Sequence, residues 1–169
     1  MGKATFDDSF FGFTLDSKHR VSVPKPYRDA VEAVSGRDGI YMVITPNLSL
    51  ACVPGTEAGA RFREMTAEWG AQFGGDFAKF AIHARATAQV VAPDGNGRVV
   101  VPSILYKRAK LGGPVHWLGR HRYFELRDAT RFDQEWEGLE LGAEGMETTV
   151  DGVLAQAAPG TENGDDDAT

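Results

Sequence analysis

The sequence lacks the features that mark secreted, membrane-bound and disulfide-stapled proteins. Cys52 is its single cysteine, which excludes an internal disulfide framework and a cysteine-rich metal site, and which is compatible with a reducing compartment. No apolar run approaches the length of a membrane span, and the N-terminus has no basic-then-apolar signal segment. A chain of 169 residues with 42% hydrophobic residues suffices for one ordinary domain or two small ones. We therefore expect a soluble cytoplasmic protein without a membrane partner.

The sequence also lacks a pattern typical of an enzyme. Its four histidines, His19, His83, His116 and His121, are scattered, and no Ser/His/Asp or phosphate-loop pattern is present. His116 and His121 flank a predicted turn without a third ligand, which favours surface residues over a zinc site. Cys52 lies in an apolar alternation and is interpreted as a small core residue. We therefore predict a protein that is not an enzyme, with no metal, no cofactor and no small-molecule substrate.

Basic residues are absent from one end of the chain. From Asp133 onward there are eleven acidic residues and no Lys or Arg, which gives this end a formal charge of −11. Residues 1–132 hold all 18 basic residues and the other 13 acidic ones, a formal charge of +5. Such asymmetry is a mild indication of a nucleic-acid partner, although a solvated surface alone would account for it. The end of the chain is rich in Gly, Ala and acidic residues, and we predict a disordered acidic tail over 141–169.

The chain does contain one nine-residue segment twice. Residues 16–24 are D-S-K-H-R-V-S-V-P, and residues 94–102 are D-G-N-G-R-V-V-V-P, an offset of 78 residues. Both fit Asp-x-x-x-Arg-Val-x-Val-Pro. Because an internal repeat organises the fold around it, we expect the two copies to be surrounded by similar elements.

The residues around each copy predict two similar modules. Period-two alternation and apolar runs predict strands, and apolar spacings of three and four predict helices. The expected elements of the first module are strands at 11–15 and 21–23, a helix at 27–34, and strands at 40–44 and 48–52. Those of the second are strands at 89–93 and 99–101, a helix at 103–111, and strands at 115–118 and 123–126. The two strands beside the first loop form either a hairpin or a paired crossing. The predicted organisation is module 1 over 9–55, a helical connector over 56–86, module 2 over 87–130 and a short helix over 131–140.

The repeated loop places Asp and Arg four residues apart, so the two side chains can interact across it. The carboxylate of Asp16 or Asp94 can accept loop backbone N–H groups and hold the guanidinium of Arg20 or Arg98. A rigid loop that presents an arginine suits contact with a phosphate or with a guanine edge. The alternative is that Asp and Arg only staple the loop, and the residues alone favour neither interpretation.

The order D-x-K-x-R-V-S-V-P-x-x-Y-R in the first module resembles the MraZ family of bacterial transcriptional regulators. D-G-N-G-R-V-V-V-P, followed by a helix with Leu, Tyr and basic residues, resembles it in the second, and the resemblance covers about residues 9–137. It implies a β-rich α+β fold of two tandem, pseudo-symmetric swapped-hairpin barrel modules of the SpoVT-AbrB type. It further implies a ring-shaped homo-oligomer, associated with the nucleoid, that binds double-stranded DNA. The DNA sites would be repeats upstream of the division and cell-wall gene cluster, which such proteins often repress.

Carried over by position, the resemblance assigns roles to five loop residues. Arg20 and Arg98 would contact DNA, and Asp16 and Asp94 would hold the two loops. Lys18 would contact a phosphate, because its flexible ammonium acts as a point charge. A rival interpretation is a non-catalytic protein-interaction or scaffold role on the same fold, which the acidic tail would suit.

The chain departs from the family at one loop position. The family usually has Gly before the first Arg, where this chain has His19, whereas Gly97 occupies the corresponding place in the second loop. A residue other than Gly is uncommon at positive φ, although His tolerates it better than most. Either the first loop differs or His19 carries some strain. Because Asn96 stands where the first loop has Lys18, we expect the first loop to contact DNA more strongly.

Overall fold

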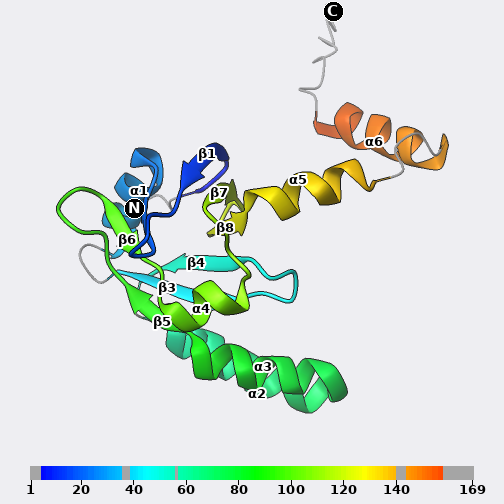
Figure 1. Ribbon diagram of the computed structural model, residues 1–169. Helices are drawn as coiled ribbons and strands as arrows, with labels where there is room; N and C mark the ends of the chain where they lie inside the picture. Colours follow the sequence, from blue (N-terminus) through cyan, green and yellow to red (C-terminus); the bar gives the residue numbers. More distant parts are fainter. Residues whose placement is uncertain (1–4, 36–38, 56, 140–143, 158–169) are drawn as a thin grey trace, which may run out of the picture. The chain divides into compact units, whose positions relative to one another are not determined.

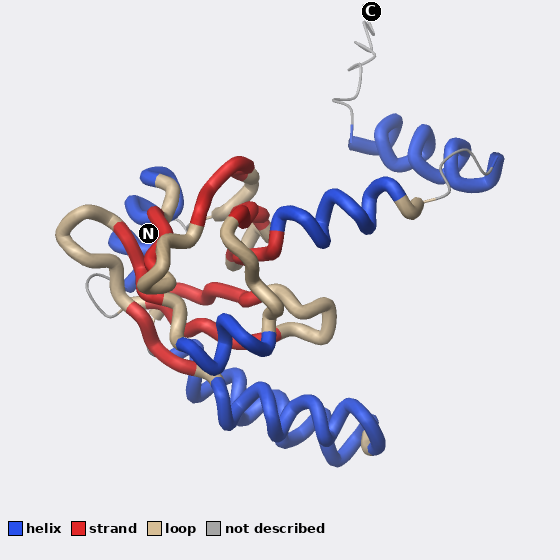
Figure 2. Tube along the Cα trace, in the orientation of Figure 1, coloured by secondary structure: helices blue, strands red, loops and turns tan. Residues whose placement is uncertain are grey.

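The computed structural model describes residues 5–35, 39–55, 57–139 and 144–157 as a mixed α+β protein (Figures 1 and 2). The helices of these residues are α1 (Lys25–Ser35), α2 (Glu57–Phe73), α3 (Gly75–Thr87), α4 (Ser103–Arg108), α5 (Ala129–Glu137) and α6 (Glu144–Ala157). The strands are β1 (Phe10–Thr14), β2 (Arg20–Ser22), β3 (Ile40–Ile44), β4 (Leu50–Pro54), β5 (Gln89–Val91), β6 (Arg98–Val100), β7 (Pro114–Gly119) and β8 (Phe124–Asp128). The chain forms two compact units, Met1–Gln134 and Glu135–Thr169. None of the described helices is long and apolar enough to cross a membrane.

Six strands form one antiparallel sheet in the order β1-β7-β8-β4-β3-β5. Every residue of β3 is buried, as its continuous apolar sequence predicts for a strand that is covered on both faces. Its register with β4 pairs Met42 with Cys52 and Ile44 with Leu50. Leu50 in turn pairs with Leu126 of β8. The hydrogen-bonded series is open, because β1 and β5 stand at its two ends.

The order of the sheet is symmetric with respect to the two repeats. By their place in the repeat, β1 corresponds to β5, β3 to β7 and β4 to β8. If each strand is exchanged for its equivalent, the result is the same strand order read from the other edge of the sheet. Strands of the first repeat therefore pair with strands of the second: β1 with β7, β4 with β8, and β3 with β5. Strands from both predicted modules belong to one sheet, so the sheet does not mark where one module ends and the other begins. The module boundaries 9–55 and 87–130 therefore stay a prediction.

The strands that follow the two loops form a separate two-stranded ribbon, β2–β6. Of the two arrangements open to the sequence, the structure has the paired crossing, since β2 pairs with β6 and β1 pairs with β7. Arg20 lies opposite Val100, Val21 opposite Val99, and Ser22 opposite Arg98. The two copies of the repeated segment are thus hydrogen-bonded to each other.

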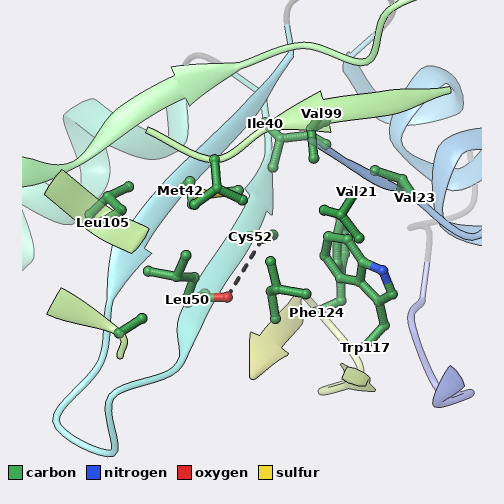
Figure 3. Close-up of a cluster of buried hydrophobic side chains, with 14 of the residues drawn as sticks. Val21, Val23, Ile40, Met42, Leu50, Cys52, Val99, Leu105, Trp117 and Phe124 are labelled. Atoms are coloured by element: carbon green, nitrogen blue, oxygen red, sulfur yellow. Dashed lines mark hydrogen bonds between the residues drawn. The ribbon is translucent and has the colours of Figure 1, made fainter. Parts of the chain in front are cut away.

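One face of the ribbon packs on the core. Val21 and Val99 are almost completely buried, and Figure 3 shows Val21 beside the ring of Trp117 and Val99 beside Ile40 in the hydrophobic cluster. Trp117 is fully buried, and its Nε1 donates a hydrogen bond of 3.0 Å to the carbonyl oxygen of Ser22. A buried indole N–H needs such a partner. This contact fixes the ribbon to β7 and so fixes where the two loops emerge.

The region 56–86, where we expect a helical connector, consists of α2 and α3, which pack against each other with α3 also on β3. Gly74 lies between the two helices, and Thr56 lies outside the described residues. Ala81 and Ala84 of α3 are buried, while Phe62 and Phe80 are half-buried against the core. α3 thus covers the sheet at β3, and neither helix contains residues of the two repeated loops.

The C-terminal part of the chain contains two helices. α5 covers Ala129–Glu137, where a short helix was expected over 131–140. The structure differs from the disorder expected from residue 141, since α6 forms over Glu144–Ala157. Glu, Met, Leu and Ala in this segment are good helix formers, so local propensity favours the helix. Residues 140–143 and 158–169 of the expected tail lie outside the described residues.

Candidate functional site

The first repeated loop is closed by hydrogen bonds to Asp16. Its Oδ1 accepts from the backbone N–H of Lys18 at 2.9 Å and from that of Arg20 at 2.8 Å. Its Oδ2 accepts from Nε of Arg20 at 2.6 Å. The backbone adds Asp16 N to Arg20 O and His19 N to Asp16 O, both at 3.0 Å. The carboxylate therefore fixes both the loop backbone and the guanidinium of Arg20, which keeps about a third of its side chain exposed.

The second loop has the same set of hydrogen bonds around Asp94. Oδ1 accepts from the backbone N–H of Asn96 at 2.8 Å and of Arg98 at 3.0 Å, and Oδ2 accepts from Nε of Arg98 at 3.2 Å. Asp94 N donates to Arg98 O, and Gly97 N donates to Asp94 O. The two loops thus have one architecture in spite of their different central residues.

These bonds lower the pKa of both loop carboxyl groups below their ordinary value of 3.8. For Asp16 the largest cause is the hydrogen bond from the backbone N–H of Arg20, and for Asp94 it is the bond from the backbone N–H of Arg98. A carboxylate that accepts backbone N–H groups is stabilised in its charged form. Both Asp side chains are therefore ionised across the physiological range, as the pairing with arginine requires.

The ribbon register brings Arg20 and Arg98 onto the same face. Residues that lie opposite each other in an antiparallel pair share a face, and so do residues two apart in a strand. Arg20, Val100, Arg98 and Ser22 therefore lie on one face, with Val21 and Val99 on the other. Arg20 and Arg98 are diagonal neighbours, which places their Cα atoms about 7–8 Å apart. The side chain of Val100 on this face is 54% exposed, so the face is open to solvent.

His19 occupies the left-handed region, with φ 59°, and corresponds to Gly97 with φ 73°. Its imidazole stacks on the ring of Tyr106 in α4, with 3.8 Å between centroids and 8° between planes. The backbone N–H of Val101 donates to the carbonyl oxygen of His19 at 2.8 Å. The first loop therefore keeps the backbone form of the second, and the stack with Tyr106 offsets part of the strain at His19.

Arg28 of α1 is the last residue of the order D-x-K-x-R-V-S-V-P-x-x-Y-R, but sequence reasoning assigned it no role at this site. A Cβ atom placed on Gly97 would lie 2.5 Å from Nη1 and 2.6 Å from Cζ of Arg28. The guanidinium therefore lies directly against the second loop. Arg28 lies four residues after Pro24, and Tyr106 lies four residues after Pro102. Arg28 and Tyr106 are therefore equivalent positions at the repeat offset of 78 residues, and this equivalence was the signal in the sequence.

Two further residues that the sequence singled out, His116 and Cys52, are buried. His116 is only 8% exposed between Phe11 and Phe132, so the expectation that it lies on the surface is wrong, because aromatic side chains cover it. Among the described residues, no group of three or more His, Cys, Asp and Glu side chains could hold a metal ion. Cys52 is fully buried, and this burial raises the pKa of its thiol.

The chain is similar to proteins named Transcriptional regulator MraZ. No protein-family model matches the chain. The Transcriptional regulator MraZ of Acidovorax sp. (strain JS42) is 32% identical over 126 residues, which are 71% of this chain and 80% of that protein. The protein of the same name from Acidovorax ebreus (strain TPSY) gives the same values. The Transcriptional regulator MraZ of Koribacter versatilis (strain Ellin345) is 36% identical over 63 residues, 37% of this chain and less than half of that relative, 43%.

These relatives are all named transcriptional regulators. The extent of the Acidovorax matches decides the family. The chain belongs to the MraZ family of transcriptional regulators.

Proposed function

We propose that the protein is a sequence-specific transcriptional regulator that binds double-stranded DNA. The observation that carries the proposal is the exposed face of the β2–β6 ribbon, on which Arg20 and Arg98 lie side by side. Each guanidinium is oriented by the carboxylate of its own loop. Fixing the guanidinium in advance reduces the rotamer entropy lost when it binds a phosphate or a guanine edge. The Cα atoms of Arg20 and Arg98 are about 7–8 Å apart, which is roughly the rise of two base steps along one strand of DNA.

The remaining site residues support this contact. Lys18 is exposed beside Arg20 and is proposed to bind a phosphate as a flexible point charge. Asp16 and Asp94 hold the loops, and His19 and Gly97 provide the left-handed turn before each arginine. The membership of the MraZ family supports a role for these loops in regulation of transcription.

The finer parts of the proposal follow from the family and from the form of the sheet. We propose that the repeats are swapped-hairpin modules of the SpoVT-AbrB type, and that the protein is a repressor. Its sites would be DNA repeats upstream of the division and cell-wall gene cluster, bound by a ring-shaped homo-oligomer at the nucleoid. The edge strands β1 and β5 leave backbone groups that another copy could pair with. Several loops on tandem sites would multiply the affinity of a single loop through effective concentration.

The test is binding of duplex DNA from the region upstream of the protein's own gene, with a shuffled duplex of equal composition as the comparison. Arg20→Ala and Arg98→Ala are expected each to lower the affinity for the upstream duplex at least tenfold, with the oligomer unchanged by light scattering. Lys79→Gln is the matched control, because Lys79 is an exposed cation on α3, which packs on α2 and β3. Affinity for the upstream duplex should also fall steeply as salt rises.

Two results would contradict the proposal. One is unchanged binding of the upstream duplex by both arginine variants, which would favour a protein-interaction role. The other is equal affinity of the wild-type protein for the upstream and shuffled duplexes, which would remove sequence specificity.

A further inference from the structure

The two loops differ in the charge that their own residues supply. The first loop contains Asp16, Lys18 and Arg20, with a formal charge of +1. The second contains Asp94 and Arg98, with Asn96 at the place of the lysine, and its formal charge is zero. The backbone of the two loops is nevertheless held by the same hydrogen bonds. If the loops bind DNA in the same way, the second lacks one cation.

Arg28 brings a cation to the second loop from the other repeat. Its Nε donates a hydrogen bond of 3.0 Å to the carbonyl oxygen of Val23, at the end of the segment that follows β2. The backbone N–H of Val23 in turn donates to the carbonyl oxygen of Gly97 at 2.9 Å. Val23 therefore connects the guanidinium and the loop backbone, so that Arg28 is held against Gly97 rather than extended into solvent.

The position of Arg28 requires glycine in the loop. The ideal Cβ of Gly97 would meet Nη1, Cζ and Nε of Arg28 at 2.5, 2.6 and 2.8 Å. These distances are shorter than any unstrained contact between such atoms. The space that a side chain at this position would fill is thus occupied by the guanidinium, one residue before Arg98.

The first loop has the reverse arrangement at the equivalent place. Residue 106 takes the position of residue 28, and residue 19 takes that of residue 97, both at the offset of 78. Here the helix supplies a neutral ring, Tyr106, and the loop supplies the side chain of His19 that stacks on it. The first loop carries its second cation within its own sequence, as Lys18.

We infer that Arg28 is a DNA-contacting residue of the second loop, where it binds a backbone phosphate beside the contact of Arg98. The inference rests on the proposed function and extends it to a residue from α1. Within the part of the chain that the structure describes, the guanidinium of Arg28 makes one hydrogen bond, through Nε. Its two Nη groups remain as paired donors, the geometry that binds a phosphate most strongly. Each loop then presents two cations, one arginine fixed by Asp and one further cation from a different source.

The test measures the salt dependence of binding to the upstream duplex and to the shuffled duplex. Arg28→Gln removes the charge but keeps an amide that can donate to Val23. It is expected to weaken binding to both duplexes about tenfold. The slope of log K against log salt should become shallower by about one for each protomer bound. An equal loss of affinity for both duplexes identifies a phosphate contact. A loss of affinity for the upstream duplex alone would overturn the phosphate contact and indicate that Arg28 contacts a base.

Three further variants make the result decisive. Lys25→Gln removes an equivalent charge from the same helix, where Lys25 pairs with Asp29, and should leave the slope unchanged. Arg28→Lys keeps the charge and should keep most of the slope of log K against log salt, even if this substitution lowers the free energy of unfolding. The double variant His19→Gly with Tyr106→Arg rebuilds the second arrangement at the first loop. It should steepen the slope by about one per protomer.

The inference and the proposed function fail in different ways. If wild-type protein and Lys25→Gln bind normally and Arg28→Gln binds with an unchanged slope, Arg28 is not a contact and the proposed function stands. An unchanged slope in the His19→Gly, Tyr106→Arg variant would likewise overturn the inference. If the wild-type protein binds neither duplex, the proposed function fails and the inference fails with it.

Discussion

Gly97→Ala is the substitution whose effect on stability follows most directly from the geometry of the second loop. Gly97 has φ 73°, and a Cβ atom there would lie 2.5 Å from Nη1 of Arg28. The new methyl group meets the end of a flexible side chain rather than backbone. The expected response is therefore displacement of Arg28, with the loop itself kept in place by Asp94.

The magnitude has two contributions. An alanine in the left-handed region costs about 1–2 kcal/mol relative to glycine. Displacement of Arg28 breaks its hydrogen bond to the carbonyl oxygen of Val23, which contributes about 1 kcal/mol. Arg28 is only partly buried, so water replaces part of the lost bond. We expect Gly97→Ala to lower the free energy of unfolding by about 2–3 kcal/mol.

The assay is urea unfolding at equal protein concentration, since association would otherwise change the apparent stability. Gly95→Ala is the control, because a Cβ atom on Gly95 meets nothing within 4 Å and its φ lies outside the left-handed region. This control should change the free energy of unfolding by less than about 0.5 kcal/mol.

A double-mutant cycle separates the two contributions. In an Arg28→Ala background the Cβ atom at residue 97 has no guanidinium to displace, so Gly97→Ala should cost about 1 kcal/mol less than in the wild-type protein. The reasoning is refuted if Gly97→Ala is no more costly than Gly95→Ala. It is also refuted if the cost is the same with and without Arg28, since the contact would then be absent in solution.

Two further predictions concern titratable groups. Hydrogen bonds lower the folded pKa of Asp16 below 3.8, so its contribution to stability is fully present above that pH and is lost as the pH falls through the lowered folded pKa; an NMR titration that gave a carboxyl midpoint at or above 3.8 would contradict the loop geometry. Cys52 is fully buried with a raised thiol pKa, so a thiol reagent at pH 8 should label it only at the rate of opening of the native protein; rapid labelling of native protein would show that β4 is accessible.

Local patterns in the sequence predicted the loops better than the pairing of the strands. The Asp-x-x-x-Arg spacing and the glycine at 97 determine the loop conformation through contacts within five residues, and these can be read from the sequence. A period-two pattern states which residues share a face of a strand, but it does not name the partner strand. That β2 pairs with β6 depends on contacts nearly 80 residues apart, to which each repeat contributes half.

The residues that sequence reasoning missed are those whose roles depend on such distant contacts. Arg28 stands in a helical segment, and nothing in its neighbourhood along the chain indicates that it covers Gly97. His116 lies in β7, and the sequence of this strand does not indicate that the imidazole is covered. It is buried because Phe11 and Phe132, from other elements, pack against it. In both cases the sequence identifies the residue type, and only the packing identifies its neighbour.

The intertwining of the repeats means that neither loop is held by its own repeat alone. Val23 of the first repeat donates to the carbonyl oxygen of Gly97, and Val101 of the second donates to that of His19. A displacement of one loop is therefore transmitted to the strand that follows the other. The separation of Arg20 and Arg98 depends on the register of a ribbon with only three residues in each strand. Since a slip of one residue would turn an arginine toward the core and a valine toward solvent, burial of Val21 and Val99 holds both arginines on one exposed face.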